Sequence, residues 1–285
     1  MSQKTSVTRR QLLKGAGLAA LSSTAGMIPA GTALAARKGN TPRWAFIVDL
    51  RRCVGCRACT VACKAEYQTP LGAFRTAVYE EVTGKYPNST KLFLPRLCNH
   101  CEGNKEDDIP PCIKECPEYP KDRREFIDKD GKKIRYRGGA TYKRPDGLVL
   151  FDNQHCTGCG KCINACPYGA RNFDKLLVSG KDATKNGITK CSLCQHRVDN
   201  GVVPACVNIC PTQARKFGDL NDPSSDVAKL VEEFGLLGKR NASTLLPNEN
   251  TEPMVFYIDP DGALEKMATA KKKYEKNDAW IDTIG

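Results

Sequence analysis

The strongest constraint on this chain is the arrangement of its sixteen cysteines, which fall into four groups of four with none left over. The first and third groups have the spacing Cys-x2-Cys-x2-Cys-x3-Cys, and the other two are split by ten or eleven residues into two pairs. In chain order the groups are Cys53, Cys56, Cys59, Cys63; Cys98, Cys101, Cys112, Cys116; Cys156, Cys159, Cys162, Cys166; and Cys191, Cys194, Cys206, Cys210. Aromatic residues make up only 7% of the chain, so we expect the cysteines to help hold the fold together.

The spacing of the cysteines indicates iron–sulfur clusters. The third group, which Pro167 follows, is the bacterial ferredoxin run, and the first group lacks only the proline. Gly55, Gly158 and Gly160 let the backbone turn close to an inorganic core. Structural zinc prefers two separated pairs of cysteines and remains an alternative for the second and fourth groups. A disulfide framework would leave cysteines three residues apart competing for partners, so we predict four [4Fe–4S] clusters.

Few other residues suggest chemistry. His100, His155 and His196 each lie within two residues of a cysteine and could replace a cysteine ligand. Because sixteen cysteines already match sixteen iron sites, we expect these histidines to hydrogen-bond sulfur or backbone instead. The sequence shows no nucleophile–base pair, phosphate loop or nucleotide fingerprint. We therefore predict no catalytic residue, and an electron-transfer subunit rather than an enzyme in its own right.

Residues 1–35 read as an export signal. They contain four basic and no acidic residues, with Arg9 and Arg10 adjacent, an apolar run over Gly15–Ile28, and the Ala-x-Ala sequence of Ala33–Ala35. This pattern predicts a twin-arginine signal cleaved after Ala35 and a periplasmic protein, with a plain secretory signal as the alternative. The apolar run is short for a membrane anchor, and no later stretch is long enough to span a bilayer. We expect membrane contact only through a partner.

The charge of the chain fits bound clusters. Removing the four bases of residues 1–35 lowers the formal net charge from +12 to +8. A [4Fe–4S] cluster with four thiolates carries about −2, so four clusters would bring the protein close to neutrality. A basic chain can also indicate nucleic-acid binding or a solvated surface. Because the clusters account for the excess, we do not expect a nucleic-acid partner.

The chain contains an internal repeat. Short apolar segments at Trp44–Asp49 and Leu148–Asp152 each end in an aspartate four residues before a cysteine group. The motif Cys-Pro-x2-Ala-Arg-x-Phe occurs twice, ending at Phe173 and at Phe217. The repeated unit is strand, cluster loop, short helix and strand. We therefore predict an α+β fold of two intertwined ferredoxin-like modules, a duplicated 2[4Fe–4S] ferredoxin.

Residues 44–223 resemble the four-cluster electron-transfer (beta) subunits of the molybdopterin oxidoreductase superfamily. Segments Asp49–Cys56, Gln68–Thr76 and Leu94–Cys101 are most similar to the tetrathionate reductase beta subunits. Polysulfide and arsenate reductase relatives, and the beta-like subunit of the sulfite-reduction-associated membrane complex, are close behind. The cysteine pattern is specific for the superfamily but not for the substrate, which the catalytic subunit selects.

The resemblance implies a crossed assignment of ligands, in which the fourth cysteine of each group binds the cluster of another group. The implied sets are site 1 (Cys53, Cys56, Cys59, Cys210), site 2 (Cys191, Cys194, Cys206, Cys63), site 3 (Cys98, Cys101, Cys112, Cys166) and site 4 (Cys156, Cys159, Cys162, Cys116). The resemblance also implies that site 1 faces the catalytic subunit and site 4 the membrane subunit. The alternative is that each contiguous group closes on its own cluster.

The function implied is a relay of single electrons between an integral-membrane quinone-reactive subunit and a catalytic subunit. That catalytic subunit would be a molybdopterin reductase of a sulfur oxyanion such as tetrathionate, and a cytochrome is a further candidate partner. One alternative is a relay in a membrane complex without a molybdenum enzyme. A remote alternative from another class is a zinc-stabilised binding module.

Together, the N-terminal pattern and the resemblance divide the chain into a signal at residues 1–35, a four-cluster domain at 36–223 and a C-terminal extension at 224–285. Two insertions, residues 102–111 and 117–147, depart from the family pattern and are read as surface elaborations or as partner-docking segments. The extension is expected to contain a helix over 226–237, a strand over Val255–Ile258 and a Lys-rich helix over 263–276. We expect it to pack outside the cluster modules, on the core or on a partner.

Overall fold

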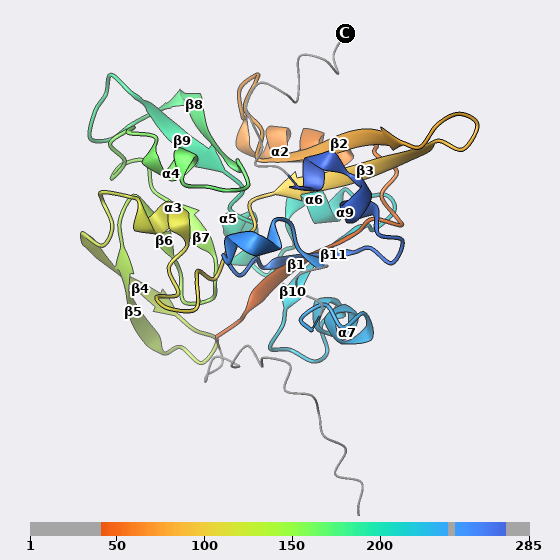
Figure 1. Ribbon diagram of the computed structural model, residues 1–285. Coiled ribbons are helices and arrows are strands. Elements are labelled where there is room, and N and C mark those ends of the chain that lie inside the picture. Colours follow the sequence, from red (N-terminus) through yellow and green to blue (C-terminus); the bar gives the residue numbers. More distant parts are fainter. Residues whose placement is uncertain (1–40, 239–242, 272–285) are drawn as a thin grey trace, which may run out of the picture. The chain divides into compact units, whose positions relative to one another are not determined.

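The computed structural model describes residues 41–238 and 243–271. The predicted signal at residues 1–35, the cleavage after Ala35 and the end of the helix expected over 263–276 lie outside these ranges. The described residues form a mixed α/β fold of short helices and small sheets (Figure 1). None of the helices described there is long and apolar enough to cross a bilayer.

A three-stranded sheet contains the first predicted strand. β1 (Trp44–Asp49) lies in its centre, antiparallel to β10 (Arg215–Asp219) and parallel to β11 (Val255–Ile258) (Figure 1). The two faces of β1 belong to different cores because successive side chains of a strand point to opposite sides. Ala45 and Ile47 pack with α7 (Asp226–Glu233), whereas Phe46 and Val48 join a core that contains cysteines.

The C-terminal extension differs from the expectation. The predicted strand Val255–Ile258 is confirmed, but it is a member of the central sheet rather than a decoration outside it. The helix expected over 226–237 ends at Glu233, and Gly235 follows with a φ of +59°. The helix expected from Ala263 is broken at Met267, which is extended and fully buried, so it forms α9 (Ala263–Lys266) and α10 (Ala268–Lys271).

Four antiparallel hairpins complete the sheets. They are β2 (Thr76–Thr83) with β3 (Thr90–Leu97), β4 (Asp122–Ile127) with β5 (Lys133–Gly138), β6 (Thr141–Lys143) with β7 (Val149–Phe151), and β8 (Arg171–Val178) with β9 (Asn186–Lys190). β7 confirms the strand expected before the third cysteine group. The insertion 117–147 supplies β4, β5 and β6, and the insertion 102–111 forms turns that lead into the next helix.

The remaining helices are short, and all except the 3-10 turn contain or adjoin a cysteine in the chain. They are α2 (Ala58–Tyr67), α3 (Pro111–Lys114), α4 (Lys161–Asn164), α5 (Gln195–Val198), α6 (Ala205–Asn208) and the 3-10 turn η1 (Pro247–Glu249). Pro110 and Pro204 precede α3 and α6, where an extended residue with no amide hydrogen is well tolerated at a helix start.

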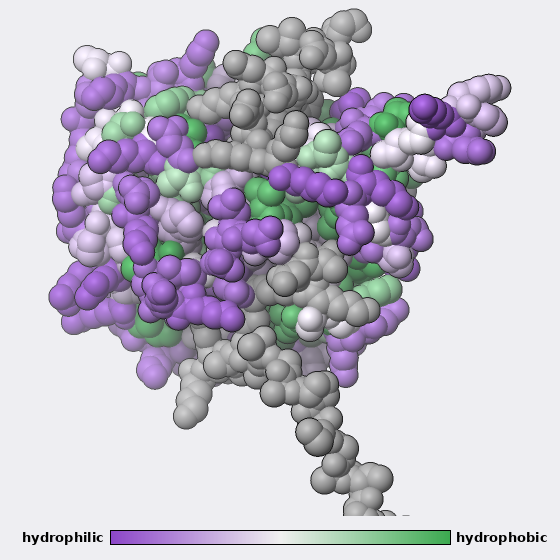
Figure 2. All heavy atoms as spheres, viewed as in Figure 1, coloured by the Kyte–Doolittle hydropathy of each residue, from purple (hydrophilic) through white to green (hydrophobic). Residues whose placement is uncertain are grey.

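Cysteines are core residues in this fold. Two of the three hydrophobic cores found among the described residues contain buried cysteines, and the third lies between the central sheet and α7. The face seen in Figure 2 is mainly hydrophilic, with small and separate hydrophobic patches. The interior therefore gathers around thiols, as expected for a chain with so few aromatic side chains.

Candidate metal-cluster sites

All four cysteine groups begin with the same loop geometry. The residue just before the second cysteine has a positive φ in every group: +69° at Gly55, +44° at His100, +65° at Gly158 and +52° at Leu193. In two groups its amide faces the first thiol, because Gly158 N donates to Cys156 Sγ at 3.3 Å and Leu193 N donates to Cys191 Sγ at 3.4 Å. Such bonds stabilise a thiolate, which is the form that binds iron.

Glycine is required at two of these positions, in agreement with the prediction. A Cβ atom added at Gly55 would lie 2.2 Å from the ring of Phe93, and one at Gly158 would lie 2.5 Å from Cβ of Lys185. His100 and Leu193 adopt the same turn without glycine, and both are 1% exposed. Histidine is enriched at positive φ among residues other than glycine but leucine is not, so residue type gave no signal for the turn at Leu193.

The third cysteine of each group is the second residue of a short helix. These cysteines are Cys59 in α2, Cys112 in α3, Cys162 in α4 and Cys206 in α6. The fourth cysteine follows four residues later, on α2 for Cys63 and just beyond the helix end in the other groups. One loop–helix unit is thus repeated four times, including in the two groups whose spacing is not that of a ferredoxin run.

All sixteen cysteines are free thiols, so none forms a disulfide. Eleven are buried, and only Cys56 and Cys159 are exposed. The exposed thiols belong to predicted sites 1 and 4, whereas all four thiols of predicted site 2 are buried. Predicted sites 1 and 4 therefore each have an exposed cysteine, whereas predicted sites 2 and 3 have none.

The fourth cysteines of two groups lie among thiols from another group. Burial, with the thiols of Cys206 and Cys194 next in effect, raises the pKa of Cys63 to about 12. Burial, with the thiols of Cys112 and Cys98 next, raises the pKa of Cys166 to about 11. Each of these cysteines therefore meets thiols of the set that the resemblance assigns to it.

The other two fourth cysteines, Cys210 and Cys116, each lie near the first cysteine of another group. Burial is the main cause that raises the pKa of Cys53, and the thiols of Cys59 and Cys210 add to it. Burial likewise raises the pKa of Cys156, with the thiols of Cys159 and Cys116 adding to it. A small cavity is lined by all four thiols of predicted site 4, namely Cys116, Cys156, Cys159 and Cys162.

The donor sets fit [4Fe–4S] clusters. Each predicted site offers thiols alone, and iron–sulfur clusters are held by cysteine thiolates. Buried thiols with raised pKa values need a nearby cation to become thiolates, and cluster iron supplies that charge. Among residues 41–238 and 243–271, no three His, Cys, Asp or Glu side chains are arranged to hold a single metal ion.

None of the three histidines near the cysteines hydrogen-bonds a sulfur atom. His100 is buried, accepts a hydrogen bond at Nδ1 from Val149 N and donates from Nε2 to Cys191 O, both at 3.0 Å. Burial is the main cause that holds the pKa of His100 well below its usual range, so this ring is neutral. His155 bonds Asp152 at 3.0 Å and His196 bonds Glu66 at 2.6 Å. The expected backbone role is confirmed for His100, and the other two bond carboxylates.

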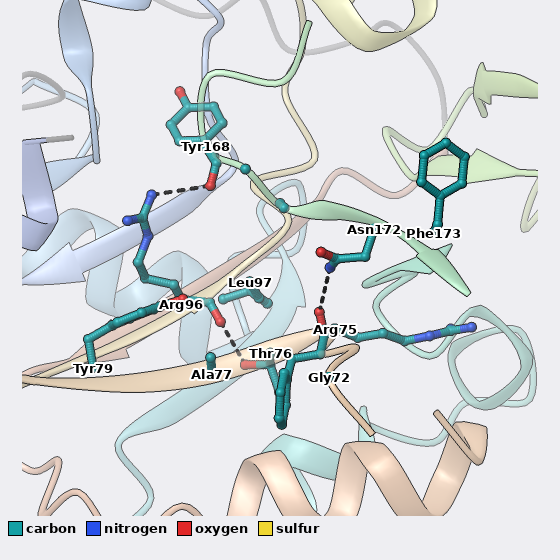
Figure 3. Close-up of a pocket in the computed structure, with 13 residues that line it drawn as sticks. Gly72, Arg75, Thr76, Ala77, Tyr79, Arg96, Leu97, Tyr168, Asn172 and Phe173 are labelled. Atoms are coloured by element: carbon teal, nitrogen blue, oxygen red, sulfur yellow. Dashed lines mark hydrogen bonds between the residues drawn. The ribbon is translucent and has the colours of Figure 1, made fainter. Parts of the chain in front are cut away.

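A cleft of about 200 Å³ lies where the β2–β3 hairpin meets the segment after Cys166 (Figure 3). Arg96 donates to Tyr168 O at 3.3 Å, and Asn172 Nδ2 donates to Phe74 O at 3.1 Å across it. No cysteine lines this cleft. Its contacts join the strand pair after the first cysteine group to the segment after the third, so they help to fix the two groups relative to each other.

Comparisons with known proteins identify 4Fe–4S domains in this chain. Residues 89–220 match the model of the 4Fe-4S dicluster domain, and residues 44–65 match that of the 4Fe-4S binding domain. The chain is 37% identical to the B subunit of tetrathionate reductase from Salmonella typhimurium, over 90% of each chain. It is 35% identical to the B subunit of selenate reductase from Mesobacillus selenatarsenatis, over 77% of this chain and 73% of the relative. It is 33% identical to the arsenate respiratory reductase iron-sulfur subunit of a Shewanella species, over 76% and 96% respectively.

Proposed function

Because the chain belongs to the family of iron–sulfur subunits of tetrathionate, selenate and arsenate reductases, we propose that it relays single electrons through four [4Fe–4S] clusters to or from a catalytic subunit. When bound, a [4Fe–4S] cluster takes up and gives back one electron at a time. The protein residues hold the clusters, exclude water from the inner pair and set the local charge.

The observation that carries this proposal is the grouping of sixteen thiols into four sets. In each proposed set, three thiols would come from one loop–helix unit and the fourth from another unit. The neighbours of Cys53, Cys63, Cys156 and Cys166 support the crossed sets of sites 1 to 4. The same crossing would make the fold two intertwined ferredoxin-like modules, with the first and fourth groups in one module and the second and third groups in the other.

Paired cysteine substitutions test the crossing. If Cys63 and Cys206 share a cluster, the double variant Cys63→Ala/Cys206→Ala should lose one cluster and retain about twelve iron atoms. Cys63→Ala/Cys59→Ala should disturb two clusters and retain about eight. Contiguous wiring reverses the two results, because Cys63 and Cys59 would then bind the same cluster. The measurements are iron and acid-labile sulfide per chain, with EPR counting of the clusters.

The two exposed thiols suggest the ends of the relay. Cys56 at site 1 and Cys159 at site 4 give electron exchange a path to the surface, and sites 2 and 3 lie inside. From the family resemblance, site 1 would face the catalytic subunit and site 4 the membrane subunit. Cross-linking through a photoreactive residue at Val54 or at Thr157 tests this orientation. Capture of the membrane subunit from the Val54 position would reverse it.

The cellular setting belongs to the same proposal. The Arg9-Arg10 signal would export the folded protein to the periplasm, where it would meet an integral-membrane quinone-reactive subunit. The catalytic partner would be a molybdopterin reductase of a sulfur oxyanion such as tetrathionate, and a cytochrome is a further candidate partner. Purification of the tagged chain from membranes should recover these partners together with molybdenum. A complex without molybdenum would remove the catalytic part of this assignment and leave the relay.

A further inference from the structure

Three cationic side chains are at most 2% exposed and have no carboxylate partner among the described residues. Lys190 is 0% exposed, Arg171 is 1% exposed and Arg215 is 2% exposed. Within the described residues, no carboxylate oxygen lies within 4.0 Å of any of their nitrogen atoms. Burying a charge without compensation is costly, so such groups normally have an ion-pair partner. Here the partner has to be something other than an acidic side chain.

The two arginines are held in matching ways. Each is the last residue of a Cys-Pro-x2-Ala-Arg motif and also the first residue of a strand, β8 for Arg171 and β10 for Arg215. Each donates to a threonine hydroxyl, Arg171 Nη1 to Thr141 at 3.2 Å and Arg215 Nη2 to Thr76 at 3.0 Å. The match follows from the internal repeat and shows that both guanidinium groups have a fixed position.

Each arginine has thiols of two neighbouring sites around it. Arg171 Nη2 lies 3.1 Å from Cys112 Sγ of site 3. Burial works against the charge of Arg171, but the thiols of Cys112 and of Cys162 in site 4 outweigh it and raise its pKa.

Arg215 has the corresponding place between the other two sites. Burial again opposes its charge, but the thiols of Cys206 in site 2 and Cys59 in site 1 outweigh it and raise the pKa of Arg215. Its Nη1 atom is buried and has no hydrogen-bond partner among the described residues. A buried donor without a partner in a thiol-rich interior can be satisfied by the sulfur atoms of a cluster.

Lys190 is the third buried cation. Its Nζ atom donates to Cys191 O at 2.7 Å and to Val149 O, which ties it to the backbone of site 2 and to the core around site 4. Burial lowers the pKa of Lys190, and the thiols of Cys98 in site 3, then of Cys191 in site 2, act in the opposite direction. Lys190 immediately precedes the first cysteine of the fourth group. The matching position before Cys98, in the second group, is Leu97, so only one of these two positions carries a cation.

We propose that a fixed positive charge lies between each pair of successive sites: Arg215 between sites 1 and 2, Lys190 between sites 2 and 3, and Arg171 between sites 3 and 4. Each charge raises the midpoint potentials of the two clusters beside it. This inference rests on the proposed function, because it needs clusters at all four sites. A nearby positive charge favours the reduced form of a cluster, which carries one more negative charge. Sites 2 and 3 each adjoin two of the cations and sites 1 and 4 adjoin one, so the inner clusters receive the larger effect.

The test is an EPR-monitored redox titration of the full-length holoprotein and its variants. Arg171→Met should lower the midpoint potentials of the clusters at sites 3 and 4 and leave the other two unchanged. Arg215→Met should do the same at sites 1 and 2, and Lys190→Met at sites 2 and 3. Arg171→Lys keeps the charge on a shorter side chain, so it should give a smaller shift than Arg171→Met. A purely structural arginine would not move specific pairs of potentials.

Iron analysis separates the possible failures. If the wild-type protein holds far fewer than about sixteen iron atoms, the four-cluster function fails and the inference fails with it. If variants with full iron keep every wild-type potential, the inference alone is overturned. If Arg171→Met and Arg171→Gln lose iron while Arg171→Lys retains it, the arginine holds the site together and the tuning role is overturned.

Discussion

The loop that carries Cys53 and Cys56 should not tolerate a side chain at Gly55, and the cost can be divided into two parts. The first part is the positive φ of +69°, which costs an alanine about 1–2 kcal/mol. The second is contact, because the new Cβ would lie 2.2 Å from the Phe93 ring. Forcing an extra methyl group into packed surroundings costs about 1–3 kcal/mol. Gly55→Ala should therefore destabilise the holoprotein by about 2–5 kcal/mol.

Gly72 offers a matched control. It has a φ of +78°, but an added Cβ would meet no atom within 4 Å. Gly72→Ala should therefore show the backbone cost alone, about 1–2 kcal/mol. A second control removes the contact instead, since Phe93→Leu makes room for the methyl group at position 55. In the double variant, the steric part of the Gly55→Ala cost should be recovered as a coupling of about 1–3 kcal/mol.

The assay is the rate at which the visible absorbance of the clusters bleaches in guanidinium chloride, because iron–sulfur proteins unfold irreversibly when their metal is lost. The steric term predicts that Gly55→Ala bleaches about 5- to 150-fold faster than Gly72→Ala. Equal rates for these two variants would refute the steric argument. Absence of coupling between Gly55→Ala and Phe93→Leu would refute it independently.

Three further predictions concern cofactor, export and pH. The anaerobically purified chain should contain about sixteen iron and sixteen acid-labile sulfide per molecule with negligible zinc, and about twelve iron with one tightly bound zinc would contradict this. Replacing Arg9 and Arg10 by lysine should leave cluster-loaded precursor in the cytoplasm, whereas the exported wild-type protein should begin at Ala36 by N-terminal sequencing. Burial alone would raise the pKa of Asp199, but its hydrogen bonds to Arg144 outweigh burial and lower it. The stability from this ion pair should be fully present above pH of about 4 and decline as the pH falls through the lowered pKa, so the excess bleaching rate of Asp199→Asn over wild type should be smaller at pH 3 than at pH 6.

Local features of this fold could be predicted from the sequence because they depend on near neighbours in the chain. Apart from the final Asp49, the strands Trp44–Asp49 and Val255–Ile258 are continuous apolar runs, as expected for strands buried on both faces. The glycines at positions 55 and 158 stand where the backbone needs a positive φ. These requirements are met by residue type alone, so a pattern reveals them.

Features that depend on long-range pairing could not be predicted in the same way. The parallel register of Phe46 with Val255 joins segments about two hundred residues apart, and no local pattern specifies that partner. The left-handed turn at Leu193 follows from the shared loop geometry and is forced on an unfavourable residue type. The arginines of the repeated motif were visible, but their burial among thiols emerges only when four groups come together.

Burial of the thiols links cluster binding to folding. Cys98, Cys166, Cys191 and Cys206 belong to the same core as Phe46 of β1 and Tyr257 of β11. Without iron, these buried thiols and the cations among them would leave that core with uncompensated polar groups. The free energy of cluster binding therefore contributes to folding, as it does for other structural metal sites. We expect iron loss and loss of the central sheet to occur together, because Val255 and Tyr257 of β11 pack in the same core as these thiols. Far-ultraviolet circular dichroism recorded during chelation should fall in step with the visible absorbance. A cluster-free chain that kept its strand signal would show instead that the sheet folds without the metal.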